Sequence, residues 1–341
     1  MIPPEKLEEI KDYLTKSTNP LFFFDGDCDG ICSYLLLKKF IDRGKGVIVK
    51  DSPILDIAYE RKIEEYYPDF VFVLDKPIIT QNFIDKVNVP LIWLDHHPIV
   101  KRNGIHYYNP RLENTKDNRP TSYWCYKITK QNLWIATLGC IADWFLPEFA
   151  KDFSKDYPDL LPKDIKKAED VLFNTRIGKL VRIVNFNLKG RTYDVMKSVN
   201  ILSRIESPYE ILDQTTPRGK FIFRIGEKMN KKYDNLLEKA LKNKPKGKLF
   251  MFVYNTEKIS FCEELANELH YRLPYEITLI AGEMKDRVKI SSRSKTVILP
   301  KIIENALKNV EGYGGGHDHA CGSNINKRDF DRFVDNIKEQ L

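Results

Sequence analysis

Three short apolar runs in the amino-terminal part of the chain each end on an aspartate. The runs and the residues that follow them are 21–24 with Asp25, 71–74 with Asp75 and 91–94 with Asp95. Apolar runs of this length predict buried strands. If these strands are parallel members of one sheet, their carboxylates lie together at its carboxyl edge, where open α/β sheets place their ligands.

Amphipathic segments separate these runs. The predicted helices cover 5–16, 31–40, 57–67, 80–86, 121–130 and 133–144, and two further short strands cover 47–49 and 105–108. Strands that alternate with helices predict a doubly wound parallel sheet.

The pattern changes after residue 150. No further strand ends on aspartate, lysines become frequent, and apolar residues recur at helical spacing up to a polar boundary over 239–248. Strands at 249–254, 277–281 and 288–291, with helices near 263–272 and 302–310, then predict a smaller α/β domain. We expect three parts: a domain over 1–150, a helical connector over 151–245 and a second domain over 246–341.

The polar residues after the apolar runs form a candidate metal site. Asp25, Asp27 and Asp29 follow the first run, and His96 and His97 directly follow Asp95. Any one aspartate after a strand is more often a turn residue or a helix cap. Several carboxylates and imidazoles converging on one edge favour a cation, because crowded carboxylates are costly without one.

Asp143 lies in an otherwise apolar predicted helix, where an unpaired carboxylate would be costly. We expect it to complete the metal site, and an exposed helix carboxylate is the alternative.

A glycine run near the carboxyl end is a candidate phosphate site. Gly314, Gly315 and Gly316 precede His317. Consecutive glycines let backbone N–H groups approach an anion, and the histidine can donate to phosphate. A flexible hairpin loop is the simpler interpretation of the run by itself.

Composition narrows the class of protein. The 341 residues carry 55 Lys and Arg against 48 Asp and Glu, a net charge of +7 that suits a polyanionic partner. The six cysteines include no CxxC pair, so we expect free thiols. No apolar run approaches the roughly 18 residues of a membrane span. We expect a cytoplasmic protein with no membrane association.

These motifs resemble those of the DHH phosphoesterases that carry a DHHA1 carboxy-terminal domain. The matching elements are Asp27-Cys28-Asp29-Gly30, Asp75, Asp95-His96-His97, Asp143, the run from Gly314 to Gly322, and the S-x-R stretch that contains Arg293.

The resemblance implies two divalent metal ions, usually manganese with magnesium as the alternative, in a cleft between the two α/β domains. The implied ligands are Asp27, Asp29, Asp75, His96 and Asp143, with Asp75 bridging the ions. Asp95 and His97 are implied as catalytic supports, and Arg293, Gly314, Gly315, Gly316 and His317 as substrate-binding residues.

One position departs from the family pattern. Many relatives have a histidine just before the first aspartate motif, where this chain has Phe23 and Asp25. We group Asp25 with the catalytic candidates. Whether it replaces that histidine as a ligand, or one metal is held more weakly, is open.

Within the family the chain is most similar to archaeal RecJ-like nucleases. This implies an exonuclease that hydrolyses single-stranded DNA or RNA from an end and releases nucleoside monophosphates. A phosphoesterase for short oligoribonucleotides, phosphoadenosine phosphate or cyclic dinucleotides is the alternative, and a scaffold subunit of the replisome is a third. Archaeal relatives also suggest a replication-protein partner of GINS type.

Overall fold

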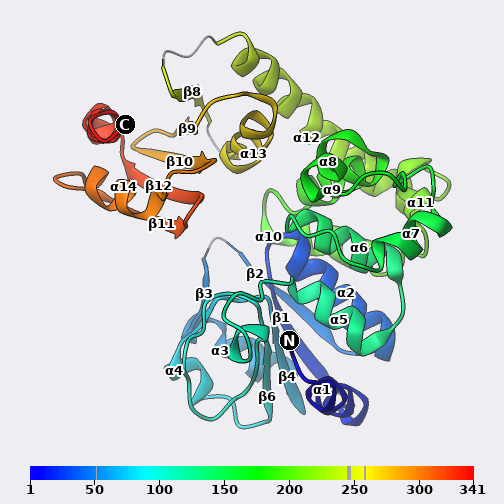
Figure 1. Ribbon diagram of the computed structural model, residues 1–341. Helices are drawn as coiled ribbons and strands as arrows, with labels where there is room; N and C mark the ends of the chain where they lie inside the picture. Colours follow the sequence, from blue (N-terminus) through cyan, green and yellow to red (C-terminus); the bar gives the residue numbers. More distant parts are fainter. Residues whose placement is uncertain (51, 244–246, 257–258) are drawn as a thin grey trace. The chain divides into compact units, whose positions relative to one another are not determined.

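The computed structural model describes residues 1–50, 52–243, 247–256 and 259–341. These fall into two compact units, Met1–Glu227 and Lys228–Leu341 (Figure 1). Residues 244–246, inside the polar boundary predicted at 239–248, lie outside the described residues. No helix among the described residues is long and apolar enough to cross a bilayer.

The first unit is built on a five-stranded sheet with the order β2-β1-β4-β6-β7. Its strands are β1 (Pro20–Asp25), β2 (Lys45–Val49), β4 (Phe70–Leu74), β6 (Leu91–Leu94) and β7 (His106–Tyr108). All neighbours pair in parallel, which confirms the predicted fold class. A separate two-stranded sheet of β3 (Ile54–Leu55) and β5 (Ile78–Ile79) was not predicted.

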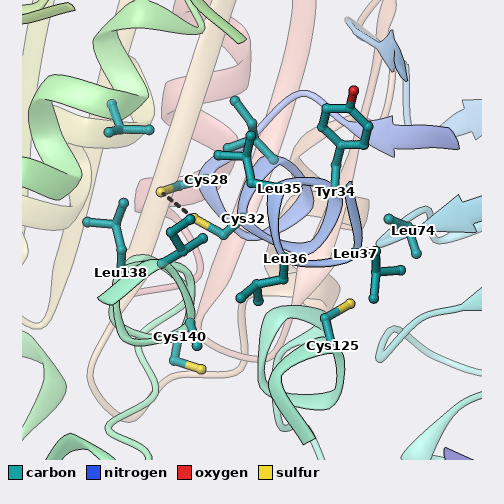
Figure 2. Close-up of a cluster of buried hydrophobic side chains, with 14 of the residues drawn as sticks. Cys28, Cys32, Tyr34, Leu35, Leu36, Leu37, Leu74, Cys125, Leu138 and Cys140 are labelled. Atoms are coloured by element: carbon teal, nitrogen blue, oxygen red, sulfur yellow. Dashed lines mark hydrogen bonds between the residues drawn. The ribbon is translucent and has the colours of Figure 1, made fainter. Parts of the chain in front are cut away.

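Alternate residues of the strands face two different cores. Phe22 and Phe24 belong to the large core shared with the helices α1 (Pro4–Lys16), α2 (Cys28–Ile41), α5 (Thr121–Thr129) and α6 (Leu133–Ala142). Figure 2 shows part of this core around α2, where Leu36 and Cys32 lie among side chains of α5 and α6. Leu21 and Phe23 belong to a second core with 3-10 helix η1 (Ile57–Tyr59), α3 (Glu60–Tyr66) and α4 (Gln81–Ile84). Successive side chains of a strand point to opposite faces of the sheet, so both faces of this parallel sheet are buried.

The helices of the predicted connector pack into the first unit. They are α7 (Ala150–Asp156), α8 (Ala168–Asn174), α9 (Arg176–Asn187), α10 (Thr192–Leu202) and α11 (Pro208–Leu212). Apolar residues of α9 and α10, such as Val184 and Val199, belong to the same core as α2. Helix α12 (Pro217–Leu241) follows and runs across the division between the units. The three-part division into 1–150, 151–245 and 246–341 stays a prediction.

The second unit has a mixed sheet with the order β11-β12-β10-β9-β8. Its strands are β8 (Leu249–Asn255), β9 (Ile277–Glu283), β10 (Arg287–Ser294), β11 (Gly312–His317) and β12 (Ala320–Asn326), and only β8 and β9 pair in parallel. The helices are α13 (Cys262–Arg272), α14 (Leu299–Ala306) and α15 (Phe330–Lys338). Helix α14 ends four residues before the predicted boundary at 310, because a turn follows and leads into β11.

Candidate metal centre

The structure brings the predicted acids and imidazoles of the first unit together at the carboxyl edge of its sheet. Three groups of residues each hold potential ligand atoms within 4.8 Å of one another. The groups are Asp25, Asp27 and Asp75; Asp75, His96 and His97; and Asp29, His96 and Asp143. Asp75 and His96 each belong to two groups, so the three form one connected cluster.

Asp75 occupies the centre of this cluster. It follows β4 in a left-handed conformation, with φ of 60°, and is only 1% exposed. Its Oδ1 accepts a hydrogen bond from Thr121 Oγ1 at 3.1 Å and lies 3.4 Å from His96 Nε2. Burial and the nearby charges of Asp29 and Asp27 raise the pKa of Asp75 well above its ordinary value. A cation here would stabilise the ionised form.

His96 is oriented by the backbone. Its Nδ1 lies 3.2 Å from the Asn118 carbonyl oxygen, so this nitrogen carries the proton and donates it. Its Nε2 then faces Asp75 and also lies 3.7 Å from Asp143 Oδ2. Burial lowers the pKa of His96, but the carboxylates, Asp143 foremost, outweigh burial and raise it. Nε2 is therefore placed to bind a cation or share a proton with the acids.

Asp95 holds His97. Asp95 is fully buried, and its Oδ1 lies 2.7 Å from His97 Nδ1. Its Oδ2 accepts from the His97 backbone N–H at 3.1 Å and from Asn109 Nδ2 at 3.2 Å. Asp95 belongs to none of the three groups of potential ligands among the described residues. Its hydrogen bonds instead orient the imidazole, as outer carboxylates do for metal-binding histidines.

Asp29 connects the cluster to helix α5. Its Oδ2 accepts from the backbone N–H of Thr121 at 2.8 Å, and its Oδ1 accepts from the N–H of Ser122 at 3.0 Å and from the Ser122 hydroxyl. The carboxylate thus binds the first N–H groups of α5, where the helix dipole favours a negative charge. Thr121, at the start of the same helix, also donates its hydroxyl to Asp75.

The first aspartate motif is shaped by the start of α2. Asp27 is the N-cap of α2 and accepts from Gly30 N at 2.9 Å. A Cβ at position 30 would lie 2.7 Å from the Asp25 backbone oxygen, so the turn accepts only glycine. Asp25 Oδ1 forms an ion pair with Lys76 Nζ at 2.5 Å. Lys76 is fully buried and also donates to the Ser52 carbonyl at 2.7 Å.

The donor set fits divalent cations. Six carboxylates gather here, those of Asp25, Asp27, Asp29, Asp75, Asp95 and Asp143. Lys76 pairs with Asp25. Carboxylates crowded in this way are costly without a cation. Mixed carboxylate and imidazole donors suit manganese, and magnesium prefers oxygen alone.

The predicted substrate residues gather on one face of the sheet in the second unit. The strand register places Arg293, Ala320 and His317 side by side across β10, β12 and β11, and Gly315 opposite Gly322 two pairs further on. Arg293 is 14% exposed and its Nε donates to Asn267 Oδ1 at 2.5 Å. Ala320 and the glycines leave a low surface between Arg293 and His317.

The glycine run differs from its prediction. Gly314 to Gly316 form no loop or nest but belong to β11, an exposed edge strand paired with β12. The hydrogen bonds to β12 fix an extended backbone that consecutive glycines would not adopt alone. Edge strands keep one row of N–H and C=O groups unpaired, so the backbone still offers donors.

Several residues around the metal centre carried no signal in the sequence. Lys76, Thr121 and Asn118 bind Asp25, Asp75 and His96 respectively, and Asn109 donates to Asp95. The one indication in the sequence that Lys76 lies near the site is that it directly follows Asp75. Their partners lie far away in the chain, so only the folded backbone pairs them.

Comparisons with known proteins identify the second unit directly. Residues 239–341 match the DHHA1 domain family. No curated protein sequence matches the chain.

Solved structures share the fold of the whole chain. RecJ from Thermus thermophilus in complex with Mn²⁺ superposes with a TM-score of 0.73 at 14% identity and covers 100% of this chain. This chain spans only 55% of the length of that RecJ. The DHH domain of a protein described as a member of a ribosomal protein family gives 0.68 at 13% identity over 99% of this chain and 92% of its own.

A third structure, the pGpG-specific phosphodiesterase PggH from Vibrio cholerae, gives a TM-score of 0.50 at 14% identity over 95% of this chain and 98% of its own. At these identities the likeness concerns the fold. The chain thus has a RecJ-like fold, and its residues 239–341 form a DHHA1 domain.

Proposed function

We propose that the protein is a metal-dependent phosphodiesterase whose active centre is the aspartate and histidine cluster of the first unit. The observation that carries the proposal is Asp75, a buried carboxylate shared by two groups of potential ligands. The fold is shared with a RecJ crystallised with Mn²⁺ and with a phosphodiesterase, which supports the same chemistry.

Two divalent ions at this cluster would supply an activated hydroxide and neutralise charge on the phosphate. Asp27, Asp29, Asp75, His96 and Asp143 are the proposed ligands, with Asp25 beside them. Asp75 would contact both ions, because it belongs to two of the groups of potential ligands. Since Nδ1 of His97 donates to Asp95, the other ring nitrogen of His97 keeps a lone pair that can bind a cation or accept a proton.

The second unit would bind the substrate. Arg293 and His317 flank the low surface of Ala320, Gly315 and Gly322, which allows a phosphate close to the backbone. A guanidinium already oriented by Asn267 can donate to phosphate oxygens with little loss of side-chain entropy. Gly314 and Gly316 would add backbone donors along the unpaired edge of β11.

The substrate we propose is single-stranded DNA or RNA, shortened from an end to nucleoside monophosphates. The RecJ-like fold and the net charge of +7 support a polyanionic substrate. The GINS-type partner expected from the family resemblance stays a prediction.

A phosphodiesterase for small nucleotides is the second candidate. The observation in its favour is that PggH, a pGpG-specific phosphodiesterase, shares the fold over almost its full length. Short oligoribonucleotides and cyclic dinucleotides belong to this candidate.

One time course separates the two. Purified protein with Mn²⁺ is incubated with end-labelled DNA and RNA of graded lengths, including dinucleotides. Progressive shortening of long strands to mononucleotides is expected, and cleavage confined to the shortest substrates would instead select the second candidate.

A matched pair of variants tests the site. Asp75→Asn should lower the rate by more than the roughly 10- to 100-fold that loss of an outer partner costs. Asp85→Asn, at the exposed end of α4, should leave the rate unchanged. Equal rates in both variants would remove the cluster from the mechanism.

A further inference from the structure

The first unit contains a cavity of about 660 Å³ that none of the proposed metal ligands lines. Its walls come from the end of α2, the start of β2, α3 and α10, which packs against β2 (Figure 1). Strand β2 is the edge of its sheet. The cavity lies at the amino end of β2, whereas the metal centre lies at the carboxyl ends of the strands. Its size is typical of pockets that bind small molecules.

The charged residues of the cavity are mostly cations. Five basic side chains line it, and Asp42 is the one acidic residue that does so; the basic ones are Lys38, Lys39, Lys45, Lys62 and Arg204. Such an excess of one sign in a concave site attracts anions.

Some of these cations already have partners. Lys39 donates to two carbonyl oxygens and to Glu206, Lys62 binds Glu65, and Lys38 donates to the Gly44 carbonyl. Lys38 and Lys39 also offset the negative end of the α2 dipole. They therefore contribute less to the binding of a ligand.

Lys45 and Arg204 are different. In the described part of the chain, no carboxylate lies within 4.0 Å of the charged group of either. Burial lowers the pKa of Lys38, and the nearby charge of Lys45 lowers it further, although Asp42 opposes both. The repulsion between lysines would be relieved by an anion between them.

Aromatic and apolar groups form the remaining wall. Tyr34 is 3% exposed, and its ring stacks on Phe24 with centroids 4.5 Å apart. A Cβ at position 46 would lie 2.6 Å from the Tyr34 ring, so Gly46 makes room for it. Tyr66 and Met196 offer further apolar surface.

The Tyr34 hydroxyl is a donor without a protein acceptor among the described residues. Within the described residues it forms no hydrogen bond, and burial raises the pKa of Tyr34 to about 12, so it stays protonated. A ligand oxygen in the cavity would satisfy it.

We propose that this cavity is a second ligand site, which binds a nucleoside mono- or diphosphate. Lys45 and Arg204 would hold the phosphate, and the base would lie against Tyr66 and Met196. Inorganic phosphate would contact the cations but not the aromatic and apolar wall. A hydrophobic ligand without charge would contact that wall but leave the cations unpaired. The combination of unpaired cations and aromatic surface selects a nucleotide.

Isothermal titration calorimetry on the full chain in EDTA tests the proposal, since metal-dependent hydrolysis is then absent. The probes are AMP, ADP, adenosine, inorganic phosphate and a short single-stranded oligonucleotide. We expect saturable binding of AMP or ADP with one site per chain. Adenosine and phosphate should each bind at least roughly tenfold more weakly.

Variants locate the site. Lys45→Gln combined with Arg204→Gln should weaken nucleotide binding roughly tenfold or more, because both phosphate contacts are lost. Both side chains are exposed, so the fold should persist, and circular dichroism melts check this. Lys11→Gln combined with Lys16→Gln, on the exposed face of α1, is the matched control. Tyr66→Ser should weaken nucleotide binding but leave phosphate binding unchanged.

Asp75→Asn should not alter nucleotide binding in EDTA. Loss of binding in that variant would place the nucleotide at the metal centre and overturn the proposal. The proposal would also be overturned if no nucleotide bound saturably with a Kd below about 1 mM. An unchanged affinity in the Lys45 and Arg204 variant would overturn it as well. Phosphate binding as tight as nucleotide binding, or binding of the oligonucleotide alone, would equally overturn it.

Discussion

The Oδ1 atom of Asp95 lies 2.7 Å from Nδ1 of His97, two residues further along the chain, and Asp95 has no exposed surface. A buried carboxylate on one ring nitrogen fixes the tautomer and the orientation of the imidazole. The other ring nitrogen is thereby kept as a base or a ligand.

We therefore predict that Asp95→Asn lowers phosphodiesterase activity about 10- to 100-fold, the range for outer partners of metal-binding histidines. His97→Gln should cost at least as much. Because both changes disrupt one pair, the double variant should be no worse than the poorer single variant. Steady-state rates of the three variants measure this coupling. Additive losses would show that Asp95 and His97 act separately.

Metal binding should stabilise the first unit. A free metal concentration of about 100 times the Kd raises the free energy of unfolding by roughly 2.7 kcal/mol. For a unit of this size this corresponds to an increase of about 5–10 °C in Tm. Differential scanning calorimetry with and without Mn²⁺ measures the shift. Asp75→Asn should abolish it, and Asp85→Asn should keep it.

Without metal, Asp75→Asn should be at least as stable as the unchanged protein. The raised pKa of Asp75 means that its charge opposes folding at neutral pH. Asparagine also tolerates the left-handed backbone at this position. A large drop in the metal-free Tm would show that the carboxylate stabilises the fold through its neighbours.

Asp29→Asn should destabilise the protein by about 1–3 kcal/mol, the cost of hydrogen bonds to a charged group. The asparagine NH₂ group would face one of the backbone N–H groups of Thr121 and Ser122, which both need an acceptor. Urea unfolding in EDTA, where bound metal contributes nothing, measures the change in free energy. No change would mean that water replaces the carboxylate at the start of α5.

The stability of the protein should depend on pH through Asp69, a carboxylate far from the metal centre. Burial would raise the pKa of Asp69, but hydrogen bonds from Ser17, Thr18 and Asn19 outweigh burial and lower it to about 2. A lowered folded-state pKa stabilises the protein above the unfolded value of about 3.9, and this stability is lost as the pH falls toward 2.

The comparison is between the unchanged protein and Asp69→Asn. Their difference in unfolding free energy should be constant between about pH 7 and pH 5 and shrink below about pH 4. Urea titrations at several pH values measure it. A difference that grows as the pH falls would contradict the role of the ionised carboxylate.

For the substrate surface, Arg293→Gln and His317→Ala should each raise KM while the Mn²⁺ content, measured by elemental analysis, stays unchanged. The reason is that both residues belong to the sheet of the second unit, whereas the proposed ligands all belong to the first unit. His319→Ala, exposed in the turn between β11 and β12, is the control. Loss of metal in His317→Ala would contradict this division of roles.

The apolar runs that end on Asp25, Asp75 and Asp95 predicted the parallel sheet correctly, because burial on both faces leaves continuous apolar sequences. The glycine run could not be predicted in the same way. Glycine has almost no conformational preference of its own, so only pairing with β12 makes Gly314 to Gly316 a strand.

The sequence alone thus determined which residue types stand at the ends of the strands, since local periodicity and burial dictate where each strand stops. Tertiary structure decided which atoms meet. Lys76 pairs with Asp25, Thr121 with Asp75 and Asn118 with His96, and the basic cavity beside β2 combines residues of four elements. Contacts across such separations depend on how the elements pack, and no local pattern records that packing.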